Sequence, residues 1–400
     1  MTLLRRCLGF HRYAFAIQYN GTPFLGFSYQ GPRGENCLVN NNNSDLRGLY
    51  SIEGRIRGAL TALVNGTQYA SETVIPSPEI EMESNSHWEQ LQVSSRTDRG
   101  VHALHNTFHV DIRSKNNGNQ ADSDWKESSL VRGLNYYLVR QARSHVQSIQ
   151  HSTAFHTTST SSLPLPRHLL YNSEHDIRIL SCRRVPSELQ LVNKHYNPQD
   201  PQDQPTHIDW NARFSATRRT YLYRILVCNP KSHNAVEYGI PFESNTSWKV
   251  WDGHEQGGTG GGLNLSAIQE AAAHLTGTRD FSSFRGKHCV RSSPIVTVDD
   301  IQIVQHSPTL LPGGGRGDDT TFGMENRNPP QVLSIVISGN AFLYRQVRNM
   351  VGCLVEVGRN KLHPKDVLDI VQACDRTQAP AMAPAQGLFL AKVEHGDFIF

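Results

Sequence analysis

The chain has 400 residues, with 39 lysines and arginines against 36 aspartates and glutamates, and a formal net charge of +3. This near balance excludes a polybasic, histone-like protein, while 38% hydrophobic residues supply material for two or three sizeable cores. The seven cysteines are widely spread and include no C-x-x-C pair, which argues against a disulfide framework and a zinc ribbon. No apolar run approaches the ~18 residues of a membrane-spanning helix, so we expect a soluble protein.

The first half of the chain predicts strands and helices in alternation. Aromatic and aliphatic residues alternate between residues 11 and 19, which predicts a half-buried strand ended by the turn residues Asn20–Pro23. Apolar residues then recur every three or four positions from Leu46 to Leu63, which predicts an amphipathic helix that ends at Asn65-Gly66. Further strands are predicted at 106–112 and 176–185, with a second helix around 130–138 between them.

The second half repeats this theme. A long alternating strand is predicted to start near Arg213 and to carry Tyr221 and Tyr223. The remaining predicted elements are a helix from Ser266 that ends at Gly277, strands at 294–304 and 332–338, a helix at 343–356 that ends at Gly358, a helix opened by His363-Pro364, and a strand at 388–393.

Two α+β halves are therefore the natural division, residues 1–207 and 208–400, joined near 186–210. Polar, low-complexity stretches interrupt both halves, and such stretches bury too little apolar surface to offset the entropy of ordering them. We predict them to be surface insertions: 40–45, 114–124, 152–166, 197–205, 253–262 and 307–330. The glycine run at 257–262 lacks the Lys-Ser/Thr of a phosphate-binding loop, which favours a plain linker.

The segment Ser94–Ala103 places one carboxylate, Asp98, between Arg96 and Arg99. In one interpretation the segment is a turn, in which Asp98 caps a backbone N–H and pairs with Arg96. In the other, guanidinium charge keeps Asp98 ionised as a nucleophile or base toward a substrate that carries phosphate. The segment taken alone favours the turn.

Six ordered segments between residues 13 and 393 are more specific together than any one alone. They are Tyr19-Asn20-Gly21-Thr22-x-Phe24-x-Gly26-Phe27, Arg96-Thr97-Asp98-x-Gly100-Val101-His102, Arg213-Phe214-Ser215-Ala216-Thr217-x-Arg219-x-Tyr221-x-Tyr223, Thr276–Arg285, Phe342-Leu343-Tyr344-x-x-Val347-Arg348-Asn349-Met350-Val351-Gly352, and Ala383–Leu388. This series resembles the tRNA pseudouridine synthase A family, and within it most closely the eukaryotic pseudouridylate synthase-like 1 branch.

The resemblance implies an enzyme that breaks the N1–C1′ bond of a uridine in tRNA, rotates the uracil and rejoins it through C5, without cofactor or metal. It also implies an α+β fold in which two related halves form one extended, mostly antiparallel sheet flanked by helices. The catalytic cleft is then expected between the halves, with the Asp98 loop in the first half and the tyrosine and arginine in the second. Family members form homodimers, so we expect one here.

The resemblance also assigns three catalytic residues. Asp98 is expected to attack C1′ directly, or to assist the departure of uracil while a glycal forms. Tyr221 is expected to stack on the flipped base and is a candidate for the base that deprotonates C5, and Arg348 is expected to pair with Asp98. From the residues alone, Tyr221 is one more inward residue of its strand, and Arg348 is an exposed helix-face arginine.

Substrate affinity is expected from contacts between basic side chains and phosphate groups. The main candidates are Arg96, Arg99, Arg213, Arg219, Arg285 and Arg345, with Arg218, Lys287 and Arg359 beside them. His102, His105 and His109 lack the spacing of a metal site. Three departures from the family's pattern, at Phe27, Ser95 and Arg99, and a long insertion at 142–175 bear on site specificity rather than on the chemistry.

Two alternatives stay open at this point. One is a catalytically inactive RNA-binding or tRNA-chaperone protein of the same fold. The other is a hydrolase of free nucleosides, which would not need so many arginines and would depend little on salt. The first 34 residues contain Arg5, Arg6, Arg12 and Arg33 and no acidic residue, which favours a mitochondrial location over the cytoplasm or nucleus.

Overall fold

The computed structural model describes residues 9–28, 51–66, 87–115, 124–155, 174–186, 190–192, 207–228, 245–251, 262–306, 331–396 and 398. The chain divides into two compact units. Unit 1 comprises Met1–Thr217 with Val393–Phe400, and unit 2 comprises Arg218–Lys392. The division falls later than the boundary predicted after residue 207, and the last residues return to unit 1. Most of the predicted insertions, and Arg5, Arg6 and Arg33, lie outside the described residues.

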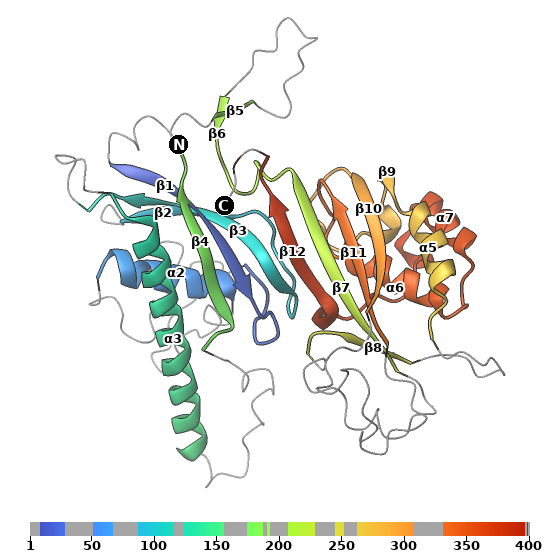
Figure 1. Cartoon of the computed structure of the whole chain (residues 1–400), viewed down its shortest axis with the longest axis horizontal. Coiled ribbons are helices and arrows are strands. Elements are labelled where there is room, and N and C mark those ends of the chain that lie inside the picture. Colours follow the sequence, from blue (N-terminus) through green and yellow to red (C-terminus); the bar gives the residue numbers. More distant parts are fainter. Residues whose placement is uncertain are drawn as a thin grey trace, which may run out of the picture. The chain divides into compact units, whose positions relative to one another are not determined.

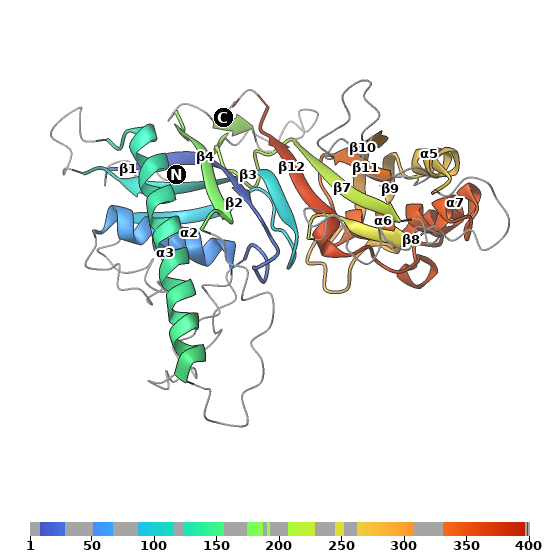
Figure 2. The same cartoon turned by 60° about the horizontal axis from the view of Figure 1, so that its bottom comes forward.

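Unit 1 contains an antiparallel sheet in the order β4 (Ile177–Arg184), β1 (Phe10–Tyr19) and β3 (His102–Arg113), with β2 (Trp88–Val93) also paired to β3. Helices α2 (Ile52–Val64) and α3 (Glu127–Phe155) pack against each other on one face of this sheet (Figures 1 and 2). A short two-stranded ribbon, β5 (Gln190–Val192) with β6 (His207–Asp209), accompanies them. Unit 1 is thus α+β, as predicted.

The strand β1 is not half-buried, as its alternating pattern predicted, but buried on both faces along its centre. Every residue of Tyr13–Ile17 is at most 1% exposed. Ala14 packs against Val185, Trp210 and Ala212, so a second apolar layer covers the face opposite the aromatic residues. The small side chains of Ala14 and Ala16 leave room for this second layer, which the alternating sequence pattern did not predict.

The two helices of unit 1 begin and end for local reasons. Ser51 caps α2 by accepting a hydrogen bond from the N–H of Gly54, and the chain leaves the helix through Gly66, whose φ is +94°. Residues 46–50, also predicted as helix, lie outside the described residues. Helix α3 runs to Phe155, well beyond the predicted 130–138 and into the predicted insertion, because no glycine or proline follows Gly133 to end it.

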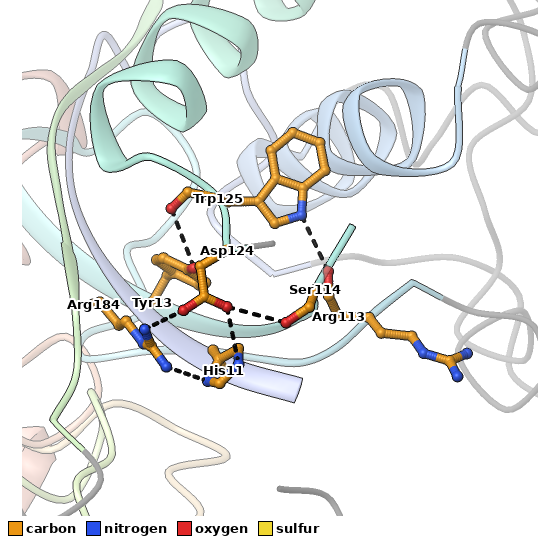
Figure 3. Close-up of polar contacts among 7 residues, drawn as sticks. All are labelled: His11, Tyr13, Arg113, Ser114, Asp124, Trp125 and Arg184. Carbon is orange, nitrogen blue, oxygen red and sulfur yellow. Dashed lines mark hydrogen bonds and ion pairs between the residues drawn. The ribbon is translucent and has the colours of Figure 1, made fainter. Parts of the chain in front are cut away.

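A cluster of polar side chains holds the start of α3 against three strand ends (Figure 3). We call His11, Ser114, Asp124 and Arg184 the Asp124 cluster. One oxygen of Asp124 lies 3.1 Å from His11 Nε2 and accepts a 3.1 Å hydrogen bond from Ser114 Oγ, and the other pairs with the Arg184 guanidinium. Tyr13 Oη donates to the Trp125 carbonyl at 3.2 Å beside it.

The strands β12 (Leu388–Glu394), β7 (Arg218–Cys228), β11 (Gln331–Gly339), β10 (Ile295–His306) and β9 (Gly277–Asp280) follow one another in this order in the same open, ten-stranded sheet, and nearly all of their residues belong to unit 2. The pairs from β7 to β9 are antiparallel, and β8 (Trp248–Trp251) runs parallel to β7. Helices α5 (Leu265–His274), α6 (Gln346–Gly358) and α7 (Pro364–Ala373) pack together beside this sheet (Figure 1). The predicted α+β class is therefore confirmed for both units.

Among the described residues of unit 2 there are also three short 3-10 helices: η6 (Ser282–Phe284), η7 (Arg376–Gln378) and η8 (Ala385–Gly387). The helices predicted from Ser266 and after His363 are confirmed, and each has a capped start. Asn264 accepts from the N–H of Ala267, and the N–H of His363 donates to Asp366. In the described part of the chain, no helix combines the length and apolar character needed to cross a membrane.

Three predicted starts were wrong. Strand β3 begins at His102 rather than at Asn106. Strand β7 begins at Arg218 rather than near Arg213, because the Asn211 side chain accepts hydrogen bonds from the N–H groups of Arg213 and Phe214 and bends that segment into a turn. Helix α6 begins at Gln346 rather than at residue 343, because Arg345 before it has a left-handed backbone with φ of +63°.

Candidate active site

The Asp98 loop connects β2 to β3 in unit 1. The Asp98 carbonyl accepts a 3.1 Å hydrogen bond from the N–H of Val101, and Gly100 within this turn has φ of +77°. The side chain of Asp98 is half-buried, whereas Arg96 and Arg99 on either side are exposed. The backbone of this segment forms a turn, while the predicted cap and the Arg96 pair of the Asp98 side chain stay predictions. The two exposed arginines can meet a solvent-side substrate.

The segment that follows β1 packs closely against the backbone of this loop. The N–H of Phe27 donates to the carbonyl of Thr97 at 3.0 Å. A Cβ at Gly26, whose φ is +117°, would lie 3.0 Å from that same carbonyl oxygen, and a Cβ at Gly21 would lie only 1.9 Å from the carbonyl oxygen of Val101. Both glycines are therefore required by close backbone approach, which explains why a glycine-bearing turn accompanies the aspartate loop in the sequence.

Buried hydrogen bonds fix the loop from the sheet side. The Tyr19 hydroxyl lies 2.9 Å from Thr97 Oγ1, and Asn106 Nδ2 donates to the Tyr19 hydroxyl at 3.2 Å and to the Ser95 carbonyl at 2.8 Å. Tyr19 and Asn106 are at most 2% exposed, so these bonds are shielded from water. Sequence reasoning did not single out Asn106, because β3 mixes polar and apolar residues and an amide among them carries no signal of its own.

The departures from the family's pattern can now be located. Phe27 is fully buried and its ring centroid lies 6.1 Å from that of Tyr19. The departure at this position therefore affects core packing and not the surface that meets substrate. Ser95 offers its carbonyl to Asn106, and Arg99 is exposed. Of the three positions, only Arg99 presents a changed side chain fully to solvent.

The histidines near the loop have structural partners. His102 Nδ1 accepts from the N–H of Gly21 at 3.2 Å, and His109 Nδ1 accepts from the N–H of Ala212 at 3.1 Å. Burial, together with the positive charge of Arg12, lowers the pKa of His109 well below its ordinary value. Among the residues described, no three acidic, histidine or cysteine side chains are grouped so that they could hold a metal ion.

Tyr221 lies on β7 in unit 2, opposite Ile337 of β11. Its side chain is 9% exposed, and its ring meets that of Phe342 edge-on with centroids 5.1 Å apart. A Cβ at Gly339 would come within 3.1 Å of the Phe342 ring, so the absence of a side chain at Gly339 leaves room for this pair. The tyrosine ring is thus held by a neighbouring ring, as a stacking platform requires.

Arg348 lies in the first turns of α6 and is 8% exposed, so its interpretation as an exposed helix-face arginine was wrong. Its Nε donates to the Ala383 carbonyl at 2.8 Å, and the N–H of Ala383 donates to the Arg348 carbonyl at 3.1 Å. These bonds join two of the segments that carry the resemblance. Asp98 belongs to unit 1 and Tyr221 and Arg348 to unit 2, so the pairing of Asp98 with Arg348 stays a prediction.

The candidate RNA-binding arginines fall into different settings. Arg213 is exposed in unit 1, and its guanidinium lies 5.4 Å from the Phe214 ring centroid. In unit 2, Arg219 Nη1 donates to the Asn340 carbonyl at 2.8 Å, and burial lowers its pKa. Arg285 donates to the carbonyls of Cys289 and Arg291, and Arg345 is exposed.

Three further basic residues were named beside them. Arg218 forms a 3.2 Å ion pair with Asp299, and Arg359 forms a 2.8 Å ion pair with Glu356. Lys287 is exposed. Ion pairing makes Arg218 and Arg359 weaker candidates for phosphate contacts than the exposed Lys287, because an RNA phosphate would have to displace the carboxylate.

The chain is similar in sequence to known proteins along most of its length. Residues 271–395 match the family described as tRNA pseudouridine synthase. The chain is 27% identical to tRNA pseudouridine synthase A of Jannaschia sp. over 96% of this chain and 95% of that protein. It is 26% identical to tRNA pseudouridine synthase A of Caulobacter vibrioides over 96% of this chain and 99% of that protein. A protein of the same name from Wolbachia pipientis wMel is 35% identical over 46% of this chain and 60% of its own length.

Proposed function

The chain belongs to the tRNA pseudouridine synthase A family, and on that premise we propose that it converts specific uridines of tRNA to pseudouridine. The observation that carries the proposal is similarity over almost the whole chain to proteins of that name. The rigid support of the Asp98 loop agrees with it, because a reacting carboxylate must be held in position.

The proposed reaction is an isomerisation. The N1–C1′ bond breaks, the freed uracil turns, and C5 bonds to C1′ while C5 loses its proton and N1 gains one. Asp98 acts at C1′, either as the nucleophile or by assisting the departure of uracil. Tyr221, supported by the edge of the Phe342 ring, stacks on the extruded uracil, because a base must leave its stack to reach such a site.

Arg348 is proposed to hold the Asp98 carboxylate ionised. A buried guanidinium is favourable only where carbonyl or anionic groups face it, and Arg348 already uses the Ala383 carbonyl in this way. Arg96, Arg99, Arg213, Arg219, Arg285 and Arg345 are the proposed contacts to tRNA phosphates. Binding is therefore expected to weaken steeply as salt is raised.

The test is tritium release from tRNA labelled at C5 of uridine, with separate cytosolic and mitochondrial tRNA pools. Wild-type protein is expected to release tritium, and Asp98→Asn is expected to lose at least about a thousandfold in rate, as when an essential nucleophile is removed. Asp124→Asn changes a carboxylate in the same unit that has only structural partners, and it is the matched control. Equal rates for Asp98→Asn and wild type would refute the assignment of Asp98.

We further propose that the protein is mitochondrial, that it is a homodimer, and that it is of the eukaryotic pseudouridylate synthase-like 1 branch. The arginine-bearing, acid-free first 34 residues support the first proposal. A reporter fused to residues 1–30 tests import, and sedimentation tests whether the 44.8 kDa chain doubles in mass. Sequence comparison across the six matching segments with members of several branches tests the third.

A further inference from the structure

Two segments of unit 2 that are distant in the sequence form one surface. The N–H of Gly286 donates to the Tyr344 carbonyl at 2.7 Å, and the N–H of Tyr344 donates to Cys289 Sγ at 3.5 Å. A Cβ at Gly286 would lie 2.8 Å from that carbonyl oxygen, so only glycine allows the approach. We call residues 285–291 together with Tyr344 and Arg345 the Tyr344 face.

The Tyr344 face is strongly cationic. Lys287, Arg291 and Arg345 are exposed, while Arg285 donates to carbonyls within the loop and stiffens it. The sequence contains no aspartate or glutamate from Phe281 to Val298 or from Asn340 to Val355. The positive charge of this face is therefore not offset by acidic residues of the two segments that build it.

An aromatic ring lies within this charge. Tyr344 is 39% exposed, and the Arg345 guanidinium lies 4.8 Å from its ring centroid. Arg345 has φ of +63°, a conformation that costs an arginine energy. An exposed ring among exposed cations is the combination that binds single-stranded nucleic acid, since bases stack on the ring and phosphates meet the cations.

The Tyr344 face is next along the chain to the segment that supports the Tyr221 ring in the same unit. The positive charge of Arg291 acts on Arg219, which is bonded to the Asn340 carbonyl. Phe342, the ring that supports Tyr221, is two residues from Tyr344. These neighbours favour a nucleotide next to a uridine stacked on Tyr221 as the occupant of this face.

We propose that the Tyr344 face binds a nucleotide that flanks the target uridine, with its base stacked on Tyr344 and its phosphates against Lys287, Arg291 and Arg345. The inference rests on the proposed function and adds a second stacking residue to it. Stacking on Tyr344 requires no hydrogen bonds to the base, so this contact tolerates different flanking nucleotides.

The first test compares tritium release from C5-labelled tRNA by wild type, Tyr344→Ala and Tyr344→Phe. Tyr344→Ala is expected to raise KM at least about fivefold with kcat within twofold, because a base–aromatic stack is lost. Tyr344→Phe keeps the ring and is expected to match wild type. Tyr136→Ala, which removes a ring that is 61% exposed on α3 of unit 1, is the matched control and is expected to leave KM unchanged.

The second test uses Cys289 as a reporter on this face. Burial raises the pKa of its thiol, but hydrogen bonds from the Tyr344 and Arg291 backbone and from the Arg285 side chain outweigh this and bring it below its ordinary value. The thiolate is the form that iodoacetamide alkylates. Saturating tRNA is expected to slow alkylation of Cys289 at least about fivefold and to leave the exposed Cys374 unaffected.

The results separate this inference from the function on which it rests. Tritium release with a normal KM for Tyr344→Ala, or alkylation of Cys289 at the same rate with and without bound tRNA, would overturn the inference and leave the function standing. No tritium release and no salt-dependent tRNA binding by wild type would overturn both.

Discussion

Asp98 and Asp124 both belong to unit 1, but the structure holds their segments in different ways. Asp124 is itself the fastening: its two oxygens join His11, Ser114 and Arg184 (Figure 3). The Asp98 loop is held at Thr97, whose carbonyl accepts a hydrogen bond from the N–H of Phe27 and whose Oγ1 lies 2.9 Å from the Tyr19 hydroxyl. A carboxylate that ties elements together cannot change its charge without loosening them. A loop fixed through neighbouring residues keeps its position while its carboxylate reacts.

Among changes to the contacts that hold the two carboxylate segments, the largest effect is expected from pushing the Asp98 loop off its support. Gly26→Ala is expected to lower kcat about a hundredfold, because the new Cβ meets the Thr97 carbonyl oxygen at 3.0 Å and the backbone of Asp98 at 3.4 Å. Gly66→Ala is the control, since Gly66 also has positive φ but a Cβ there meets nothing within 4 Å. Tritium release per folded molecule measures the difference. A similar loss of kcat in both variants would mean that backbone strain, not displacement of the loop, is responsible.

A smaller effect is expected from removing one hydroxyl behind the loop. Tyr19→Phe leaves Thr97 Oγ1 and Asn106 Nδ2 without this partner, and we expect kcat to fall about tenfold with little change in KM. Tyr13→Phe removes a hydroxyl from the same strand, but from a bond to the Trp125 carbonyl. Each variant is expected to lose about 1 kcal/mol of stability, measured by urea unfolding. Equal kcat in both variants would refute a positioning role for Tyr19.

Breaking the Asp124 cluster is expected to lower stability and leave chemistry unchanged. Asp124→Asn removes the charge that faces Arg184 and His11, and we expect a loss of about 1–2 kcal/mol in the free energy of unfolding. The estimate is modest because these side chains are partly exposed and screened by water. Urea unfolding measures the loss of stability, and tritium release from the same preparation checks that kcat is unchanged. A fall in kcat beyond the unfolded fraction would mean that this cluster also positions the active site.

The regular elements of both units could be predicted because the apolar residues of their sequences recur with a period of two or 3.6 residues. Strands β1, β10 and β11 and helices α5 and α7 are examples. The strand β2 was missed because Gln90 has φ of +59° and its pairing with β3 shifts register there, so its inward residues do not alternate. Helix α6 is buried on nearly every side. Its sequence therefore does not separate a buried face from an exposed one, and the burial of Arg348 could not be predicted from it.

The candidate site was predicted only in part. The resemblance pointed to Asp98, Tyr221 and Arg348, and their roles stay predictions. The support of the loop could not be predicted, since Gly26 and Thr97 are distant in sequence and their contact depends on how β1 and β3 pair. Asn106 was missed for the same reason, because a buried amide gains its meaning only from the partners that the fold brings to it.

The smallest expected effect is a pH dependence of stability through His11 in the Asp124 cluster. Burial and the charge of Arg184 lower the pKa of His11, although Asp124 raises it in part. Below about pH 6.5 the unfolded chain therefore binds a proton that the folded chain resists, so His11 makes stability fall as the pH falls from 7 to 5. The contribution of His11 to the free energy of unfolding is small, because its side chain is partly exposed and solvent screens it. Urea unfolding at both pH values is expected to show a smaller fall for His11→Gln than for wild type. A larger fall in His11→Gln would mean that protonated His11 stabilises the cluster through Asp124, and that the carboxylate outweighs Arg184.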